Sequence, residues 1–160
     1  MNVTIASNAH FIDRPTARRL KELGIMSVAI SVYGSTGGVH DRMTKQPGSF
    51  DRTMEGARNL LTEGVVTIFR FVMTHFNQHE LDAMLAMAKG MGAYHRLMGN
   101  MTPRTDRSRD PLDLRVDRET FGKITKINME GHKLPALAAP DPDQRAIKCG
   151  VSWNTVTLNP

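Results

Sequence analysis

Cysteine is almost absent from this sequence. The 160 residues contain one cysteine, Cys149. An internal disulfide is therefore excluded, and a reducing, cytoplasmic setting is expected. A single thiol also excludes a thiolate metal site or an iron–sulfur cluster held by this chain unaided, because such clusters are bound by several cysteine thiolates.

Long apolar runs are missing as well. No stretch approaches the roughly 18 apolar residues that a membrane-spanning helix needs, so no membrane partner is expected. Residues 1–11 lack the basic region and the apolar core of a secretory signal peptide. With 40% hydrophobic and 23% charged residues, the chain has the composition of one folded globular domain rather than of a disordered segment.

Aromatic residues are also scarce, at 6% of the chain, whereas the net charge is +5. The basic residues gather at 14–21 and at 104–115. Neither block carries the interleaved aromatic side chains on which proteins stack single-stranded nucleic acid. We therefore expect a solvated surface and no nucleic-acid partner. A basic nucleic-acid binder stays open as an alternative, and a steep loss of binding with added salt would identify it.

Strand and helix signals alternate along the chain. Apolar, β-branched runs predict strands at 2–6, 27–32, 65–73 and 93–98. Apolar residues at helical spacing predict a helix after each strand, the first capped by Asp13 and the last by Asp117. Asn77 and Glu80 resemble a capping box at the start of the third helix. Residues 33–49 are predicted to be a loop, with a short helical turn near His40.

This alternation favours a parallel sheet with crossover helices. Strands that are apolar on both faces, such as residues 28–32, are typical of a sheet covered by helices. A complete eight-unit barrel needs about 250 residues. The sequence therefore predicts an α/β fold, a partial parallel (β/α) barrel of about four βα units with an open sheet.

Polar residues lie at the carboxyl ends of the predicted strands or just after them, at the edge where parallel α/β folds carry their chemistry. They are Ser7, Asn8, His10, Ser31, Tyr33, Gly34, Arg70, Thr74, His75, Asn77, Asn100 and Arg104. The scarcity of carboxylates favours a site that binds a polar ligand over an acid/base pair. The glycine-rich stretch 33–38 matches neither a P-loop nor a dinucleotide fingerprint. His75 and His79 have zinc-ligand spacing, but the expected cap at Asn77 separates them and the HExxH glutamate is missing.

Several segments resemble the radical SAM enzymes, in the order in which that family carries them. Ile5–Asp13 resembles the third barrel strand and the loop after it, although Ala9 stands where the family usually has glycine. The remaining matches are Val28–Gly34 with His40–Thr44 and Pro47–Phe50 (fourth strand and following helix), Phe69–Asn77 (fifth strand), Thr102–Asp106 with Asp110–Arg115 (after the sixth strand) and Cys149–Pro160 (opening of a SPASM domain).

The resemblance implies a domain organisation. Residues 1–131 would be a partial radical SAM barrel, from its third to its sixth strand. Residues 132–148, which contain three prolines, would be a linker, and residues 149–160 would be the start of a SPASM-like extension. The CxxxCxxC loop that binds the catalytic [4Fe–4S] cluster in the family is absent from the 160 residues. The resemblance therefore implies an internal fragment that is inactive alone.

The resemblance also implies the chemistry of the parent enzyme. Its members reductively cleave S-adenosylmethionine (AdoMet) to a 5′-deoxyadenosyl radical, using electrons from a donor such as flavodoxin or ferredoxin, and modify a peptide or a small metabolite. Ser7, Asn8, Ser31 and Arg70 would contact AdoMet, with Arg70 pairing with its carboxylate. Cys149 would ligate an auxiliary [4Fe–4S] cluster. The alternative is a non-catalytic α/β module that binds a ligand or partner through the same edge.

Overall fold

Strands and helices alternate in the computed structural model, which describes residues 3–130. The strands are β1 (Thr4–Ser7), β2 (Ser27–Val32), β3 (Thr67–Val72) and β4 (Tyr94–Met98). The helices are α1 (Arg14–Glu22), α2 (Gly37–Thr44), α3 (Ser49–Thr62), α4 (Leu81–Met91) and α5 (Arg118–Glu130), with the 3-10 helices η1 (Gln78–Glu80) and η2 (Asp110–Leu114). The predicted linker at 132–148 and the extension at 149–160 lie outside the described residues. Within residues 3–130, no helix is long and apolar enough to cross a membrane.

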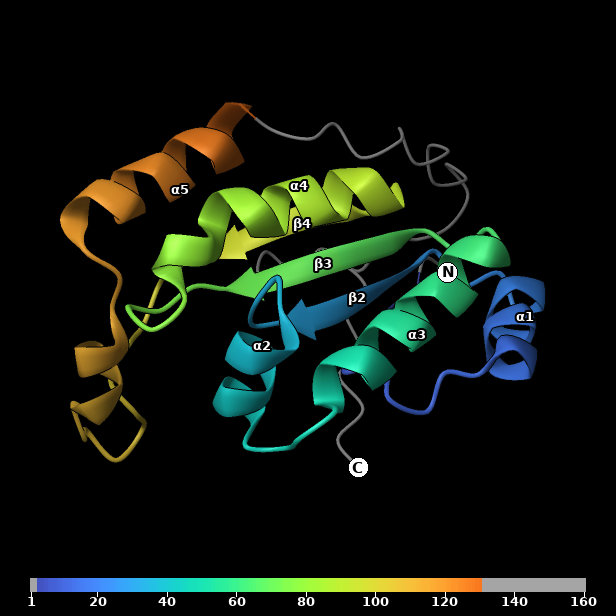
Figure 1. The fold of residues 1–160 in the computed structure, drawn as a ribbon, viewed down its shortest axis with the longest axis horizontal. Helices are drawn as coiled ribbons and strands as arrows, with labels where there is room; N and C mark the ends of the chain where they lie inside the picture. The colour runs from blue at the N-terminus through green and yellow to red at the C-terminus, as the bar shows by residue number, and fades with distance from the viewer. Residues whose placement is uncertain (1–2, 131–160) are drawn as a thin grey trace, which may run out of the picture.

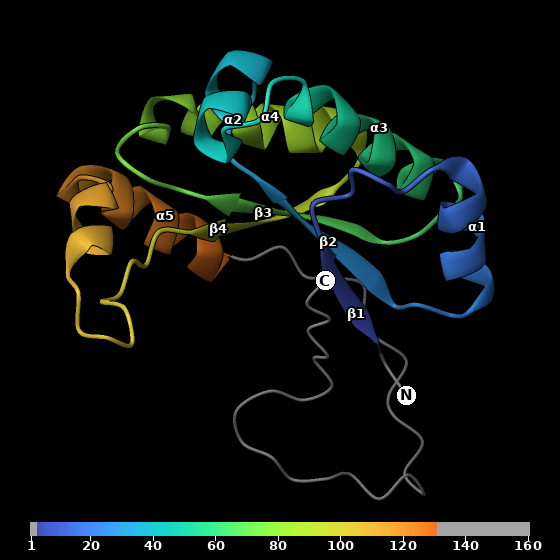
Figure 2. The same cartoon turned by 90° about the horizontal axis from the view of Figure 1, so that it is seen from below.

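The four strands form one parallel sheet in the order β1-β2-β3-β4 (Figure 1). Because the spatial order equals the chain order, crossovers of the same hand bring the connecting helices to the same side of the sheet. Figure 2 shows α2, α3 and α4 over one face, with α1 beside them. The predicted partial parallel (β/α) barrel with an open sheet is therefore confirmed.

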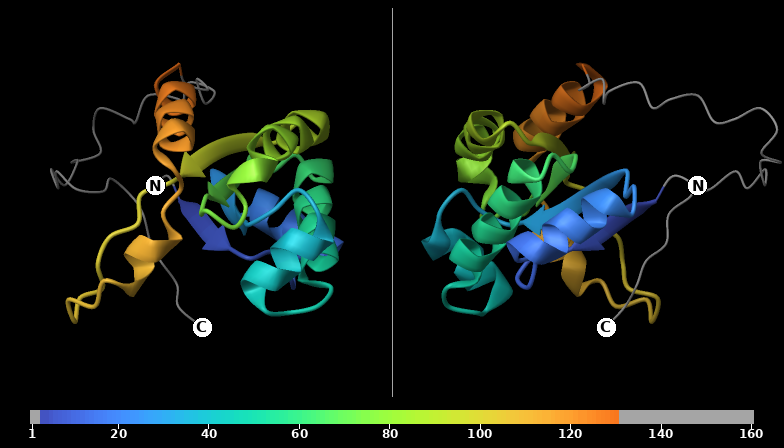
Figure 3. Two further views of the ribbon diagram at one scale, coloured as in Figure 1. Left: turned by 60° about the vertical axis from the view of Figure 1, so that its left-hand side comes forward. Right: turned by 90° about the vertical axis from the view of Figure 1, so that its right-hand side faces the viewer.

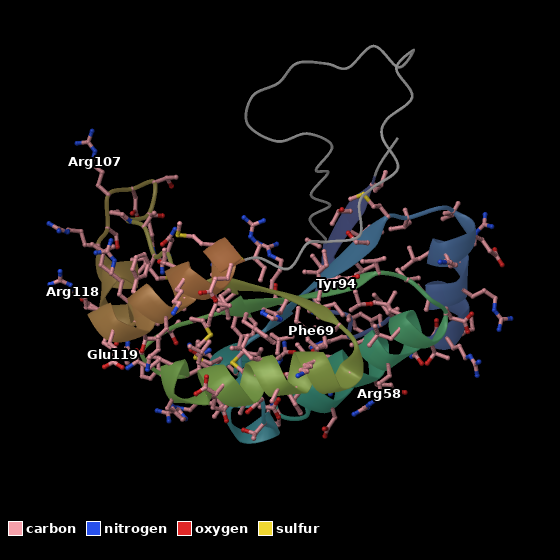
Figure 4. All side chains as sticks on the ribbon, turned by 90° about the horizontal axis from the view of Figure 1, so that it is seen from above. Arg58, Phe69, Tyr94, Arg107, Arg118 and Glu119 are labelled. Atoms are coloured by element: carbon pink, nitrogen blue, oxygen red, sulfur yellow. The ribbon has the colours of Figure 1, made fainter. Side chains whose placement is uncertain are left out.

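The two faces of the sheet carry different side chains. Along β3, Phe69 and Phe71 are fully buried under the helices, whereas Arg70 between them is half-buried on the other face. Figure 4 shows Phe69 on the side of the helices and Tyr94 on the opposite side. We call the face away from α1–α4 the open face. In a (β/α) barrel the helices lie outside, so this face corresponds to the barrel interior.

The hydrophobic core lies between the sheet and α1, α3 and α4. Its fully buried members are Ala17, Val28, Ile30, Val32, Ala57, Leu60, Phe69, Phe71, Met73, Met84 and Ala88. They recur every second residue on the strands and every third or fourth residue on the helices, as each geometry requires. The predicted caps hold at both ends of this layer, where the Asp13 carboxylate accepts from Thr16 N and the Asp117 carboxylate accepts from Thr120 N.

Two local predictions were wrong. The loop expected at 33–49 contains a helix of eight residues, α2, whose own His40 side chain is buried and fixes its position. Asn77 and Glu80 do not form a capping box. The Asn77 side chain makes no capping bond and turns instead to backbone groups of neighbouring strands, while the Glu80 carboxylate binds the loop after β2.

Helix α5 lies beyond β4, on the other side of that strand from α4 (Figure 3). The Asn128 side chain faces the outer edge of β4, where its Oδ1 accepts from Leu97 N and its Nδ2 donates to Leu97 O at 2.9 Å. The amide therefore satisfies one donor and one acceptor of a strand edge that no fifth strand covers within the described part of the chain.

Candidate functional site

Three polar side chains form a straight row across the open face. Ser31 on β2 is in register with Arg70 on β3, and Arg70 is in register with Arg96 on β4. Register partners on neighbouring parallel strands point to the same face, about 5 Å apart. One hydroxyl and two guanidinium groups therefore lie side by side, and we call Ser31, Arg70 and Arg96 the donor row.

Apolar side chains border the donor row on both sides. The register row below it holds Ala29, Ile68 and Tyr94, and the row above it holds Val72 and Met98 on β3 and β4. Nε and Nη2 of Arg70 each lie 3.3 Å from Met98 Sδ. A thioether is a weak acceptor and carries no charge, so it orients the guanidinium without neutralising it.

No carboxylate compensates the two guanidinium charges within residues 3–130. The open-face positions of the four strands are Thr4, Ala6, Ser27, Ala29, Ser31, Ile68, Arg70, Val72, Tyr94, Arg96 and Met98, none of them acidic. The ion pairs that the structure shows among these residues involve neither Arg70 nor Arg96. The donor row is therefore a surface that can bind an anionic oxygen group.

The loops above the donor row are held by a buried amide. Asn77 is fully buried; its Nδ2 donates to Tyr33 O at 2.7 Å and to Val72 O at 2.9 Å, and its Oδ1 accepts from Thr74 N at 2.7 Å. Tyr33 follows β2 and Thr74 follows β3. This one side chain therefore ties together the carboxyl ends of two neighbouring strands.

Glu80 fixes the glycine-rich loop after β2. Its carboxylate accepts from Ser35 N at 2.7 Å and from the Thr36 hydroxyl at 3.1 Å. A Cβ at Gly34 would lie 2.9 Å from Glu80 Oε2 and 2.9 Å from His40 N. Glycine is required at position 34 because the loop passes close to the Glu80 carboxylate. This glycine therefore serves the geometry of the loop, and the stretch matches no phosphate-binding motif.

The buried His40 on α2 supports the same loop, while its neighbour Asp41 holds the start of α3. His40 Nδ1 accepts from Tyr33 N at 3.3 Å, and its ring packs edge-on against Tyr33 and Phe50. Burial lowers the pKa of His40, which keeps the imidazole neutral as this acceptor role needs. Hydrogen bonds from Phe50 N and from Ser49 lower the pKa of Asp41, whose carboxylate thereby anchors the start of α3.

The loop after β1 is held against α3. The Thr53 hydroxyl donates to Asn8 O at 3.1 Å, and a Cβ at Gly56 would collide with the Ala9 carbonyl oxygen. Ala9 is buried and adopts a φ of 62°, in the left-handed region that favours glycine. This geometry explains physically why a glycine suits the position.

The structure brings only some of the predicted site residues together. Ser31 and Arg70 are neighbours in the donor row. Ser7 is in register with the buried Ile30, on the face of the helices, and its Oγ accepts from Ala9 N at 2.9 Å; Asn8 is exposed one residue further on. Their proposed cofactor contacts stay predictions, as does the role of Cys149, which lies outside the described residues.

Sequence reasoning missed Arg96. Its strand is short and reads as Tyr-His-Arg-Leu-Met, too polar for a buried strand and too apolar for a loop. The available signal was the alternation that places Arg96 and Met98 on one face and Leu97 on the other. Its partnership with Arg70 is a property of the register between β3 and β4.

Solved structures share this fold. The structure of native anSMEcpe with bound AdoMet and Cp18Cys peptide matches with a TM-score of 0.62 at 14% identity, over 81% of this chain and 36% of that one. SuiB of Streptococcus suis matches with a TM-score of 0.60 at 14% identity, over 99% of this chain and 33% of that one. No protein-family model matches the chain.

Two curated proteins of Methanosarcina barkeri (strain Fusaro / DSM 804) are related in sequence. An Fe-coproporphyrin III synthase is 31% identical over 84 residues, which are 52% of this chain and 21% of that protein. An AdoMet-dependent heme synthase is 26% identical over 110 residues, which are 68% of this chain and 32% of that protein. The chain is similar to radical SAM enzymes, as its motifs predict. The aligned region covers about a fifth to a third of the length of the two relatives.

Proposed function

We propose that this chain is the AdoMet-binding part of a radical SAM enzyme and that Ser31 and Arg70 of the donor row bind the cofactor. The observation that carries the proposal is the register that places the Ser31 hydroxyl beside the Arg70 guanidinium on the open face. These groups suit the methionyl carboxylate of AdoMet, because a guanidinium donates two parallel hydrogen bonds to a carboxylate. The four described strands would be the third to the sixth of the barrel.

The chain's own residues would bind and orient the cofactor. Arg70 would hold the carboxylate, Ser31 would donate to it or to the ribose, and Ser7 and Asn8 would lie nearby. The apolar rows around the donor row would exclude water, which strengthens charged hydrogen bonds. Bound there, AdoMet would supply 5′-deoxyadenosyl radical chemistry to the parent enzyme.

The described residues do not fit the catalytic cluster. They contain no cysteine and no group of three or more histidine, cysteine or acidic residues that could hold a metal ion. We therefore propose that the cluster ligands are supplied by residues other than these 160 and that the chain alone does not cleave AdoMet. We further propose that Cys149 ligates an auxiliary cluster in a SPASM-like extension at 149–160, after a linker at 132–148.

Partners follow from the same proposal. A solved neighbour carries a bound peptide beside AdoMet, which supports a peptide substrate, and the two archaeal relatives support a small metabolite. A one-electron donor such as flavodoxin or ferredoxin would serve the parent enzyme, in the cytoplasm.

Calorimetric titration of the full chain with AdoMet tests the proposal. We expect Arg70→Gln to weaken binding about 10- to 100-fold, the loss of one charge-assisted interaction, and Ser31→Ala to weaken it less. Figure 4 shows Arg58 on the far side of the helix layer, so Arg58→Gln removes the same charge and should leave binding unchanged. No binding of AdoMet, or equal binding by Arg70→Gln, would overturn the assignment.

A second assay tests the inactivity of the chain by itself. After anaerobic iron–sulfur reconstitution, the 160-residue chain should form no 5′-deoxyadenosine from AdoMet and a reductant. Product above the level of a sample without protein would show that the cluster ligands lie within these residues.

A further inference from the structure

Arg96 is the feature of the open face that cofactor binding does not use. The AdoMet methionyl group carries a single carboxylate, and Arg70 with Ser31 supplies a complete set of donors for it. Arg96 adds a second guanidinium at the next register position of the same row, on the neighbouring strand. Like charges directly opposite each other on a sheet are unfavourable. One carboxylate neutralises only one of the two guanidinium charges of Arg70 and Arg96, so a second anionic group would stabilise the pair.

The surroundings of Arg96 point to a ligand rather than to a structural ion pair. Its side chain is exposed on the open face and forms no ion pair with any residue from 3 to 130. Its strand neighbours Tyr94 and Met98 on that face are uncharged. By contrast, Arg14 and Arg18 on α1 both form ion pairs with Glu63, so the positive charges of that arginine pair are compensated by a carboxylate of the same chain.

The position of Arg96 decides which ligand it would meet. Ser31 and Arg70 form one end of the donor row and Arg96 the other, on β4, the last strand of the described sheet. A ligand on Arg96 would lie beside the AdoMet carboxylate without replacing it. It would also lie on the face that lines the interior of a barrel, where a substrate has to approach the cofactor.

We infer that Arg96 is a substrate-binding residue and that the substrate carries a carboxylate. The inference rests on the proposed function, because it places AdoMet on Ser31 and Arg70. A carboxylate on Arg96 would form two parallel hydrogen bonds with the guanidinium and would relieve the repulsion between the two arginines. The carboxylate can belong to a small organic acid or to an acidic residue of a peptide, and the test separates these sources.

The experiment uses the full chain and two pairs of probes. The first pair is succinate and its neutral counterpart succinamide; the second is acetyl-Gly-Glu-Gly-amide and the same peptide with glutamine. Each probe is titrated by NMR into the chain saturated with AdoMet, and the arginine Nε–H signals are followed. We expect an acidic probe of at least one pair to shift the Arg96 signal while its neutral counterpart does not, and the tighter-binding acid identifies the source.

Variants locate the effect. Arg96→Gln should weaken the acidic probe at least about 10-fold and leave the AdoMet affinity within about 2-fold, whereas Arg96→Lys should give an intermediate loss because lysine keeps the charge but not the two parallel donors. Arg58→Gln, the matched control, should change neither affinity. Retained near-ultraviolet circular dichroism of Arg96→Gln shows that the variant is folded.

Each failure has a separate signature. If AdoMet binds but neither acid does, or if Arg96→Gln binds the acids as well as the original chain, the inference is wrong and the proposed function stands. If AdoMet displaces the acids completely, the donor row holds one anion and the inference is also wrong. If the acids bind through Arg96 and AdoMet does not bind at all, the proposed function is wrong and the carboxylate site stands.

Discussion

The two faces of this single sheet obey different rules. The face under α1, α3 and α4 is filled with fully buried aromatic and aliphatic side chains. The stability of the fold therefore depends on their packing. The open face carries a hydroxyl and two guanidinium groups between apolar rows, and it contributes little packing. Neighbouring residues of one strand can therefore have separate roles, because their side chains point in opposite directions. Phe69 contributes to stability, whereas Arg70 is available to bind a ligand.

The sharpest test of this division is a pair of substitutions on one strand. Phe69→Ala should lower the free energy of unfolding by about 3–5 kcal/mol, because it empties a fully buried site. Ile68→Ala, its half-buried neighbour on the open face, should cost well under half as much. Urea unfolding followed by circular dichroism measures both. Equal losses would show that the open face is as tightly packed as the helix-covered one.

A second test concerns the contact that holds the β1 loop. Gly56→Ala places a Cβ against the Ala9 carbonyl and 3.0 Å from the Ala9 Cβ. Since backbone must move, we expect a loss of about 2–3 kcal/mol, measured by thermal unfolding. Gly122→Ala, in α5 with open space around the new Cβ, is the matched control and should stabilise slightly, by about 0.5–1 kcal/mol.

The buried amide that ties β2 to β3 gives a smaller effect. Asn77→Ala leaves Thr74 N and two strand-end carbonyls without their partner, at a cost of about 1–3 kcal/mol. It should also loosen the loops above the donor row, so amide hydrogen exchange at Tyr33 and Thr74 should accelerate more than exchange in the core of β3. Uniform acceleration would contradict this local role.

The pH dependence of stability should report on His40, which supports the loop after β2. Because burial lowers the pKa of His40 in the folded chain, the unfolded chain binds this proton more tightly. The stability is therefore complete above the unfolded value of about 6.5 and falls as the pH drops below it. Unfolding midpoints between pH 7.5 and 5 should decline less steeply for His40→Gln than for the original chain; parallel curves would rule out the contribution of His40.

The smallest effect is expected at Ala9. Ala9→Gly relieves a left-handed conformation that costs an L-residue about 1 kcal/mol, but glycine makes the unfolded chain more flexible by a similar amount. The two terms nearly cancel, so the free energy of unfolding should change by less than about 0.5 kcal/mol in urea titrations. A large loss would show that the buried Ala9 methyl group contributes more packing than its size suggests.

Sequence reasoning predicted the repeating units well and the site in part. The strand at 27–32 and the caps at Asp13 and Asp117 match the structure because hydrophobic period and side-chain capping are local properties. Ser31 and Arg70 were identified at the ends of apolar strands. Arg96 was missed because its neighbour Arg70 lies on another strand, and Asn77 was misread as a cap because its amide bonds the backbone of Tyr33, distant in the sequence.

The amino-acid sequence by itself determined the alternation of strands and helices and the lack of cysteines for a cluster, since each depends on residue type and spacing alone. Only the tertiary structure decided which side chains share the open face. The register of β3 against β2 and β4 aligns Ser31, Arg70 and Arg96. A shift by one residue would have turned Arg70 toward the helices, because side chains alternate along a strand. That register is set by the packing of Phe69 and Phe71 in the core.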